Sequence, residues 1–261
     1  MNVRSLPQKI NYYWRIVGTT LSFASFGIGG LILSLVFIPP AQLWPGTEQQ
    51  KVRRVRWMIS KTFGFFVGLM NALGVMKTQS KNNQLLNGVA GCLVVSNHPS
   101  LVDVVVIISL IKNANCVIKQ GVVRNPFMRW VVKAAGYIVN TDSESLIDEC
   151  KRSLAKGDCL VIFPEGTRTK PGQPITLKRG AANIAVRALA PFMTARISVN
   201  PTTLIKGQWW FQVPDKKVLF TIEWLAKCPS SDFYAEDAEP ALAARQCTKN
   251  LQQYFQQNCE Q

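Results

Sequence analysis

The distribution of apolar residues divides the chain into two parts. No charged residue occurs between Ile16 and Thr47, and the apolar part of this segment, Ile16–Ile38, is 23 residues long. A helix needs about 20 apolar residues to cross a bilayer, so this stretch is long enough to insert into a membrane. Pro39-Pro40 follows and is expected to end the helix, because proline lacks an N–H and clashes with the preceding turn.

A second apolar stretch, Thr62–Met76, holds 15 uncharged residues. At this length it is expected to lie in the membrane interface or to re-enter rather than to span. The alternative is that both stretches are buried helices of a soluble bundle. A secretory signal peptide fits poorly, because the first stretch is too long and no small-residue cleavage site follows. Basic residues flank the first stretch on both sides, so charge does not choose between crossing the membrane and dipping into it.

From about residue 85 the pattern changes to short apolar runs separated by polar segments of helical length. The runs predict strands at 92–96, 115–118, 136–140, 159–163, 193–199 and 218–224. The segments between them predict helices near 99–112, 126–135, 143–156 and 178–189, with Ala238–Gln257 as a closing amphipathic helix. This alternation predicts an α/β domain with a largely parallel sheet flanked by helices. We therefore divide the chain into an N-terminal membrane-associated helical segment, 1–80, and an α/β domain, 81–261.

Charge reinforces this division. The net charge is +15, and residues 1–80 hold nine basic residues and one acidic residue. Four of the basic residues form a cluster between the two apolar stretches: Lys51, Arg53, Arg54 and Arg56. Positive charge beside an apolar segment favours anionic lipid headgroups, and no nucleic-acid-binding motif accompanies it. The expected partner is an anionic membrane surface, and no nucleic acid.

The seven cysteines are scattered, odd in number and without a CxxC pair. This pattern favours free thiols in a reducing, cytosolic environment and argues against a zinc site. A single histidine also excludes a histidine-rich metal site. We expect no metal and no bound cofactor.

That histidine, His98, lies in the run Asn97-His98-Pro99-Ser100-Leu101-Val102-Asp103, directly after the predicted strand 92–96. Pro99 suits the first position of a helix, with Asn97 or Ser96 as the N-cap. This arrangement would place a base at the end of a strand and an orienting carboxylate, Asp103, one helical turn on. The alternative is a helix start whose histidine only caps or packs.

A second charged run begins about 60 residues downstream. The apolar segment Cys159–Phe163 leads directly into Pro164-Glu165-Gly166-Thr167-Arg168-Thr169. Ligands bind at strand ends in α/β sheets, and the planar guanidinium of Arg168 suits phosphate. The alternative is a tight turn with a solvated pair of Glu165 and Arg168.

Together the two runs resemble the motifs of the glycerolipid acyltransferase family, the 1-acyl-sn-glycerol-3-phosphate or lysophospholipid acyltransferases. The family's His followed by four residues and Asp is matched by His98 and Asp103, and its Phe-Pro-Glu-Gly-Thr-Arg motif is matched without change by Phe163–Arg168. The resemblance covers roughly residues 90 to 200. It implies an acyltransferase catalytic domain within 81–261.

The resemblance implies transfer of a fatty acyl group from an acyl thioester to the hydroxyl of a lysophospholipid such as 1-acylglycerol-3-phosphate. The thioester of acyl carrier protein or coenzyme A would be a substrate, not a bound cofactor. His98 would act as the base, and Asp103 would stabilise the imidazolium. The acceptor site would be shaped by Glu165, Gly166, Thr167 and Arg168, with Arg168 neutralising a phosphate. The domain would act on the cytoplasmic face of a membrane. In a bacterium this would be the inner membrane.

One feature departs from the family pattern. Many members carry a phosphate-binding arginine after the run that corresponds to Gly136–Asp142, and no arginine occurs here between Lys133 and Lys151. The acceptor headgroup therefore stays open. Two other functions also stay open. A non-catalytic lipid-binding membrane protein would have no need of the His98–Asp103 pair, and an acyl-thioester hydrolase would release fatty acid without an acceptor.

Two further segments allow two interpretations each. Trp209-Trp210-Phe211 is bracketed by Lys206 and Lys216-Lys217 and suits either a membrane surface or a packed loop. Lys178-Arg179-Gly180 is expected to be a solvated helix start, with contact to a phosphate-bearing donor or acceptor as the alternative.

Overall fold

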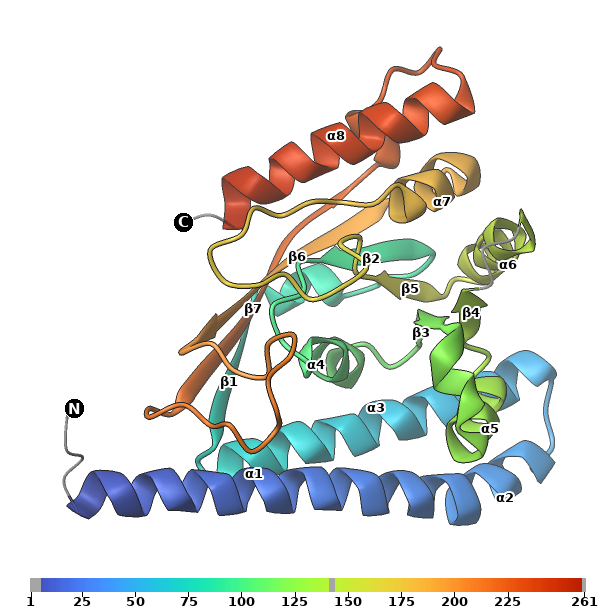
Figure 1. Ribbon diagram of the computed structural model, residues 1–261. Helices are drawn as coiled ribbons and strands as arrows, with labels where there is room; N and C mark the ends of the chain where they lie inside the picture. Colours follow the sequence, from blue (N-terminus) through green and yellow to red (C-terminus); the bar gives the residue numbers. More distant parts are fainter. Residues whose placement is uncertain (1–5, 141–143, 260–261) are drawn as a thin grey trace.

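A computed structural model describes residues 6–140 and 144–259 of the chain. Its centre is a seven-stranded sheet with the order β1-β7-β6-β2-β5-β3-β4 (Figure 1). The strands are β1 (Met76–Lys81), β2 (Cys92–Ser96), β3 (Ala114–Lys119), β4 (Ile138–Asn140), β5 (Cys159–Ile162), β6 (Phe192–Asn200) and β7 (Val218–Cys228). Only β6 and β7 pair antiparallel among these strands. The predicted α/β class with a largely parallel sheet is confirmed.

Each of the six predicted strands is present, and β1 was not predicted. Its sequence, Met-Lys-Thr-Gln-Ser-Lys, has no alternation of apolar and polar residues. It is a strand because it pairs in parallel with β7, from Met76 opposite Val218 to Lys81 opposite Glu223. The predicted boundary between residues 80 and 81 falls inside this strand, so the sheet draws on both predicted parts of the chain.

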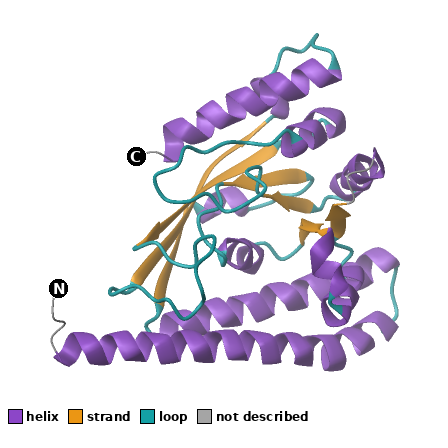
Figure 2. Ribbon diagram, in the orientation of Figure 1, coloured by secondary structure: helices purple, strands orange, loops and turns teal. Residues whose placement is uncertain are grey.

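Helices cover both faces of the sheet (Figure 2). They are α4 (Asp103–Leu110), α5 (Pro126–Ala134), α6 (Glu144–Ala155), α7 (Gly180–Ala188) and α8 (Pro240–Cys259). Short 3-10 helices occur at Asn83–Leu86, Gln120–Arg124 and Ser230–Phe233. Side chains from α6, α7 and α8 form the core on one face, and side chains from α3 and α4 form the core on the other. The first residue of the predicted helix 143–156, together with Thr141 and Asp142, lies outside the described residues.

The N-terminal segment is a helical hairpin. It consists of α1 (Leu6–Ile32), a π-helical turn (Leu33–Phe37) and α2 (Ile38–Leu43), followed by α3 (Glu48–Ala72) running back along α1 (Figure 1). The expectation that Pro39-Pro40 ends the helix is wrong. The π-helical turn precedes the prolines, and a new helix, α2, begins after it. Pro39 and Pro40 therefore lie in the first turn of α2, where a missing N–H is tolerated.

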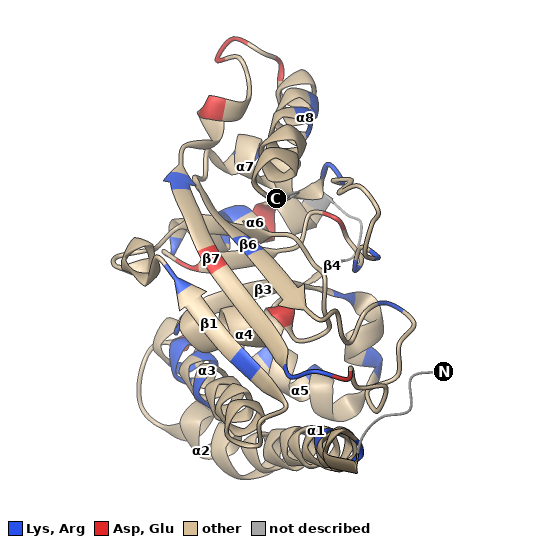
Figure 3. Ribbon diagram, turned by 90° about the vertical axis from the view of Figure 1, so that its left-hand side faces the viewer, with Lys and Arg blue, Asp and Glu red and all other residues tan. Residues whose placement is uncertain are grey.

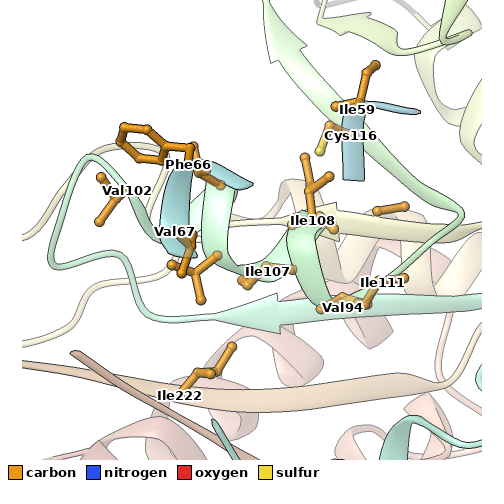
Figure 4. Packing of buried hydrophobic residues seen from close by; sticks show 14 of the residues in the cluster. Ile59, Phe66, Val67, Val94, Val102, Ile107, Ile108, Ile111, Cys116 and Ile222 are labelled. Atoms are coloured by element: carbon orange, nitrogen blue, oxygen red, sulfur yellow. The ribbon is translucent and has the colours of Figure 1, made fainter. Parts of the chain in front are cut away.

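Helix α3 lies between α1 and α4 and belongs to the core. Figure 4 shows Val67 of α3 beside Ile107 of α4, and Phe66 and the strand residue Val94 belong to the same core cluster. Burying an aliphatic or aromatic side chain of this size contributes about 1.5–3 kcal/mol. The stretch Thr62–Met76 was expected to lie in the membrane interface. Most of it is the second half of α3, and its buried face packs on α4.

Arg54 and Arg56, from the basic cluster between the apolar stretches, make bonds within the protein, which we did not expect. Arg56 is buried and pairs with Asp158, with 2.9 Å between Nη1 and Oδ2. Arg54 donates to the carbonyl oxygens of Ala41 and Trp44, at 2.9 and 3.1 Å. Figure 3 shows the basic positions gathered on α3. Arg56 is therefore unavailable to lipid headgroups, because its guanidinium holds the hairpin to the α/β domain.

The outer side of the hairpin is apolar and exposed. The segment Leu6–Leu43 has the length and composition of a membrane-spanning helix, with a mean hydropathy of 2.2 over its most apolar window, of which only 22% is buried. Its exposed large apolar residues extend along the whole segment and include Ile10, Tyr13, Trp14, Val17, Leu21, Ile28, Leu31, Leu35, Val36, Leu43 and Trp44. Trp209, Trp210 and Phe211 are exposed as well, although Trp210 lies near Phe23 of α1, with 6.4 Å between ring centroids.

Candidate active site

The loop that carries His98 begins where β2 ends, at Ser96. Asn97 fixes this point. Its side-chain oxygen accepts from the backbone N–H of Ile197 at 2.7 Å, and its amide nitrogen donates to the carbonyl of Ile197 at 2.8 Å. The side chain thus continues the pairing of β2 with β6 for one more position. The backbone is then free to turn at His98.

His98 and Asp103 form a hydrogen-bonded pair, with 2.7 Å between Nδ1 and Oδ2. Asp103 is fully buried, whereas the His98 side chain is 19% exposed. The imidazole stacks on Phe163 with 4.2 Å between ring centroids. With Nδ1 directed to the carboxylate, Nε2 has no hydrogen-bond partner within the part of the chain that the structure describes. It is the nitrogen available to a substrate.

The local backbone differs from the prediction. We expected a helix starting near Pro99, but α4 starts at Asp103. The carboxylate of Asp103 accepts from the backbone N–H of Ser100 at 2.8 Å, which closes a tight turn ahead of the helix. The same oxygen therefore orients the imidazole and holds the loop that carries it. A helix through these residues would direct the N–H of Ser100 along its own axis.

Burial dominates the electrostatics of Asp103. It raises the pKa of the carboxyl group, against the opposing effects of the hydrogen bond and charge of His98, the Ser100 N–H and the charge of Arg168. The second oxygen, Oδ1, is buried and without a hydrogen-bond partner among the described residues. An incompletely satisfied carboxylate favours a cation beside it. This environment would stabilise an imidazolium at His98.

Glu165 joins the two sequence motifs. It is buried, and its Oε1 accepts from the backbone N–H of His98 at 2.8 Å. Its Oε2 accepts from the hydroxyl of Thr169. The backbone N–H of Thr169 in turn donates to the carbonyl of His98 at 3.2 Å. Burial raises the pKa of Glu165, opposed by the His98 hydrogen bond. Both oxygens are engaged within the protein, so in this geometry Glu165 positions His98.

The residues that follow Glu165 in the second motif form a turn next to its hydrogen bond with the His98 backbone. Gly166 has a φ of +68°, and its N–H donates to the carbonyl of Phe163 at 3.0 Å. That φ favours glycine. Thr167 is exposed. Arg168 is half-buried, and its Nη1 donates to the carbonyls of Leu204 and Ile205 at 2.8 and 3.2 Å.

The segment 203–205 was not predicted as part of the site. Besides the bonds from Arg168, it accepts a hydrogen bond from the Ser100 hydroxyl at the carbonyl of Thr203, at 3.1 Å. The N–H of Leu101 donates to Leu204, also at 3.1 Å. Nothing in the local sequence indicates these contacts, because they join segments about 36 and 103 residues apart. Asn97, Ser100, Phe163 and Thr169 were also missed as site residues, although they lie inside or next to the two motifs.

His98, Asp103 and Glu165 therefore meet at the carboxyl ends of β2 and β5, with Arg168 on the same turn. Strand register explains this meeting. Strands β2 and β5 are parallel neighbours paired from Cys92 opposite Cys159 to Val95 opposite Ile162, so the two motifs leave the sheet side by side. No cluster of three or more His, Cys, Asp or Glu side chains within residues 6–140 and 144–259 could hold a metal ion.

Comparisons with known proteins relate this part of the chain to known acyltransferases. Residues 77–202 match the family model described as Acyltransferase. A chloroplastic 1-acyl-sn-glycerol-3-phosphate acyltransferase from Arabidopsis thaliana is 32% identical over 116 residues, which is 42% of this chain and 31% of the relative. The corresponding enzyme from Helicobacter pylori is 34% identical over 122 residues, or 44% of this chain and 48% of the relative. The aligned part thus spans less than half the length of these relatives.

The fold has a solved counterpart. The crystal structure of the 1-acyl-sn-glycerophosphate acyltransferase PlsC from Thermotoga maritima matches with a TM-score of 0.68. The match covers 94% of this chain and 97% of that one, at 17% sequence identity. The shared architecture thus includes the N-terminal helices as well as the sheet. Residues 77–202 thus match an acyltransferase domain, and the relatives support the resemblance to the glycerolipid acyltransferase family.

Proposed function

We propose that this protein transfers a fatty acyl group from an acyl thioester to the hydroxyl of a lysophospholipid, with 1-acylglycerol-3-phosphate as the expected acceptor. The observation that carries the proposal is the hydrogen-bonded pair of His98 and Asp103. It leaves Nε2 of His98 without a partner among the described residues, and Glu165 holds the backbone of His98 in place. The relatives named above are 1-acyl-sn-glycerol-3-phosphate acyltransferases, which supports lysophospholipid acylation.

The reaction needs no nucleophile from the protein. Nε2 of His98 takes the proton of the acceptor hydroxyl as its oxygen attacks the thioester carbonyl. Asp103 stabilises the imidazolium that forms. When the tetrahedral intermediate collapses, the carbon–sulfur bond breaks, and the proton on Nε2 passes to the departing thiolate. The products are the ester and the free thiol, and His98 returns to its neutral form.

The test uses purified full-length protein in detergent with 1-acylglycerol-3-phosphate as acceptor. Acyl-coenzyme A and acyl carrier protein thioester are supplied in separate reactions, and the diacyl product is measured by mass spectrometry alongside release of free thiol. We expect product and thiol in equal amounts from at least one donor. Thiol and free fatty acid without acceptor would identify a hydrolase instead. Lipid binding without thiol release would identify a non-catalytic protein.

We also propose that the outer face of α1 and α2 is embedded in the cytoplasmic leaflet of a membrane, the inner membrane if the protein is bacterial. One side of α1 packs on α3, and the other exposes Leu21 and Ile28 at 51% and 58%. Leu35, in the π-helical turn that follows, is 62% exposed. A helix whose second side is apolar and unpaired suits an orientation along the membrane plane. There the domain would meet both a water-soluble thioester and a membrane lipid, and exposed basic side chains would meet anionic headgroups.

Membrane fractionation tests this placement. The intact protein should resist high-salt washing and be released by detergent, because salt screens charge but does not weaken apolar burial. Changing Leu21, Ile28 and Leu35 together to Asp should shift the protein toward the soluble fraction. The matched control is Leu189→Asp, since Leu189 is 80% exposed at the end of α7, on the other side of the sheet. Release of the unaltered protein by salt alone would contradict the proposal.

A further inference from the structure

Lys178 lies on the turn of the second motif, although it is ten residues beyond Arg168. Its backbone N–H donates to the carbonyl of Pro164 at 2.8 Å. Its side chain then crosses Gly166. A Cβ placed on Gly166 would lie 3.0 Å from Cδ of Lys178 and 3.2 Å from its Nζ. The missing side chain at Gly166 thus provides the space in which the ammonium group rests.

The ammonium group of Lys178 differs from the neighbouring charged groups in having no hydrogen-bond or ion-pair partner among the described residues. Asp103 and Glu165 are buried carboxyl groups whose hydrogen bonds are made within the protein. Arg168 has one terminal nitrogen committed to the carbonyls of Leu204 and Ile205. Lys178 is exposed, and its Nζ forms no hydrogen bond or ion pair to any residue that the structure describes. Its three donors are therefore available to a ligand on the motif turn.

We propose that Lys178 binds the phosphate of the lipid acceptor, with Arg168 as the second cation. This inference rests on the proposed function. A phosphate monoester carries a charge of about −1.5 to −2 at neutral pH, so a single partly committed guanidinium would leave much of that charge unpaired. A lysine acts on phosphate as a point charge and needs no bidentate geometry.

Covalent structure favours the acceptor over the donor as the source of the phosphate. In 1-acylglycerol-3-phosphate the phosphate is attached one carbon from the carbon that bears the reacting hydroxyl, so it must lie close to His98. The phosphates of coenzyme A, or the one on acyl carrier protein, are separated from the thioester by the whole pantetheine arm. Lys178 rests on Gly166, and the adjacent Glu165 bonds directly to the backbone of His98. The Lys178 ammonium is therefore near the position of the acceptor.

Kinetics with paired variants test the assignment. Lys178→Ala should raise the acceptor KM by about tenfold to a hundredfold, the usual effect of losing a charged hydrogen bond. The donor KM should change less than about twofold, and Lys178→Arg should restore most of the acceptor affinity. The matched control is Arg179→Ala, because Arg179 is the exposed neighbour whose side chain makes no capping bond to α7. Lys178→Ala should also reduce the preference for the phosphate-bearing acceptor over monoacylglycerol, which lacks the phosphate.

A binding measurement separates this inference from the proposed function. Titration calorimetry of 1-acylglycerol-3-phosphate into His98→Ala protein reports acceptor binding without turnover. Adding Lys178→Ala to that protein should weaken binding by about tenfold or more, whereas adding Arg179→Ala should not. Equal effects of the two substitutions, or a rise confined to the donor KM, would overturn the assignment. If the wild-type protein transfers no acyl group, the calorimetry still decides whether Lys178 holds a lipid phosphate.

Discussion

Two buried aspartates in this molecule are paired with basic side chains, but their surroundings differ. Asp158 is bonded through both oxygens, with Oδ1 accepting from Asn113 at 3.0 Å and Oδ2 accepting from Ser153 at 2.7 Å and pairing with Arg56 at 2.9 Å. Asp103 has one oxygen bonded to His98 and Ser100 and the other without a partner among the described residues.

The pKa values of the two carboxyl groups move in opposite directions. Burial raises the pKa of Asp158, but the hydrogen bond and charge of Arg56, with Ser153 and Asn113, outweigh it and lower the pKa below 3.8. At Asp103 burial prevails and the pKa is raised. The negative charge of Asp158 is fully paired and hydrogen-bonded within the protein. Asp103 has one buried carboxylate oxygen without a partner among the described residues, which suits the proposed role of His98 as a general base.

The largest effect should come from removing the proposed base, His98. His98→Ala should lower acyl transfer by about a hundredfold to ten-thousandfold, the range for loss of general-base catalysis. Thermal unfolding should hardly change, because the imidazole is partly exposed and its backbone bonds to Glu165 and Thr169 remain. Transfer rates of the variant and the wild type, measured at saturating substrate, check this. Wild-type turnover would remove His98 from the mechanism.

At the other aspartate the effect should fall on stability. Asp158→Asn leaves the buried guanidinium of Arg56 without its charge partner and should cost about 3 kcal/mol of unfolding free energy. Because the folded-state pKa of Asp158 is lowered, its contribution is present above its ordinary pKa of 3.8 and is lost as pH falls through the folded value.

Urea unfolding at several pH values measures this difference. The stability difference between wild type and Asp158→Asn should be full at pH 7, begin to narrow near pH 3.8 and close as the pH falls through the lowered pKa of the folded state. The KM values for both substrates should stay near wild type, since Asp158 lies beside Gly157 at the other end of β5. A stability gap that persists in acid would mean that the Arg56–Asp158 charge pair is not its source.

Glu165 offers a smaller effect at the first site. Glu165→Ala removes the acceptor for the His98 N–H and should lower kcat by about tenfold, the equivalent of one hydrogen bond. Glu165→Gln keeps an oxygen for that N–H and an amide for Thr169, so it should retain most of the activity. The pair of kcat values checks this. A Gln variant as impaired as the Ala variant would show that Glu165 acts through its charge.

The smallest effect is expected for the stability of Asp103→Asn. Because the folded pKa of Asp103 is raised, its ionisation costs stability, and the cost grows as pH rises above the ordinary value of 3.8. The Asn variant should therefore unfold within about 1 kcal/mol of wild type at pH 7 and gain relative to it as pH rises. Its turnover should still fall, since Asn gives no charge to the imidazolium. Destabilisation comparable to Asp158→Asn would erase the contrast between the sites.

The sequence by itself determined the α/β class, the six strands with apolar runs and the two motifs, because these depend on local periodicity and on residue identity. His98 and Asp103 are five residues apart, so their meeting needed only a turn. Tertiary structure alone decided the rest. Strand β1 has no apolar alternation and exists through its pairing with β7. Arg56, in a basic cluster that suggested headgroups, is buried because Asp158 is brought opposite it from 102 residues away. The placement of Lys178 over Gly166 likewise depends on the path of the chain after the motif. Such long-range contacts produce no periodic pattern in the sequence. Each of these residues could equally be exposed to solvent, and only the folded chain brings its partner next to it.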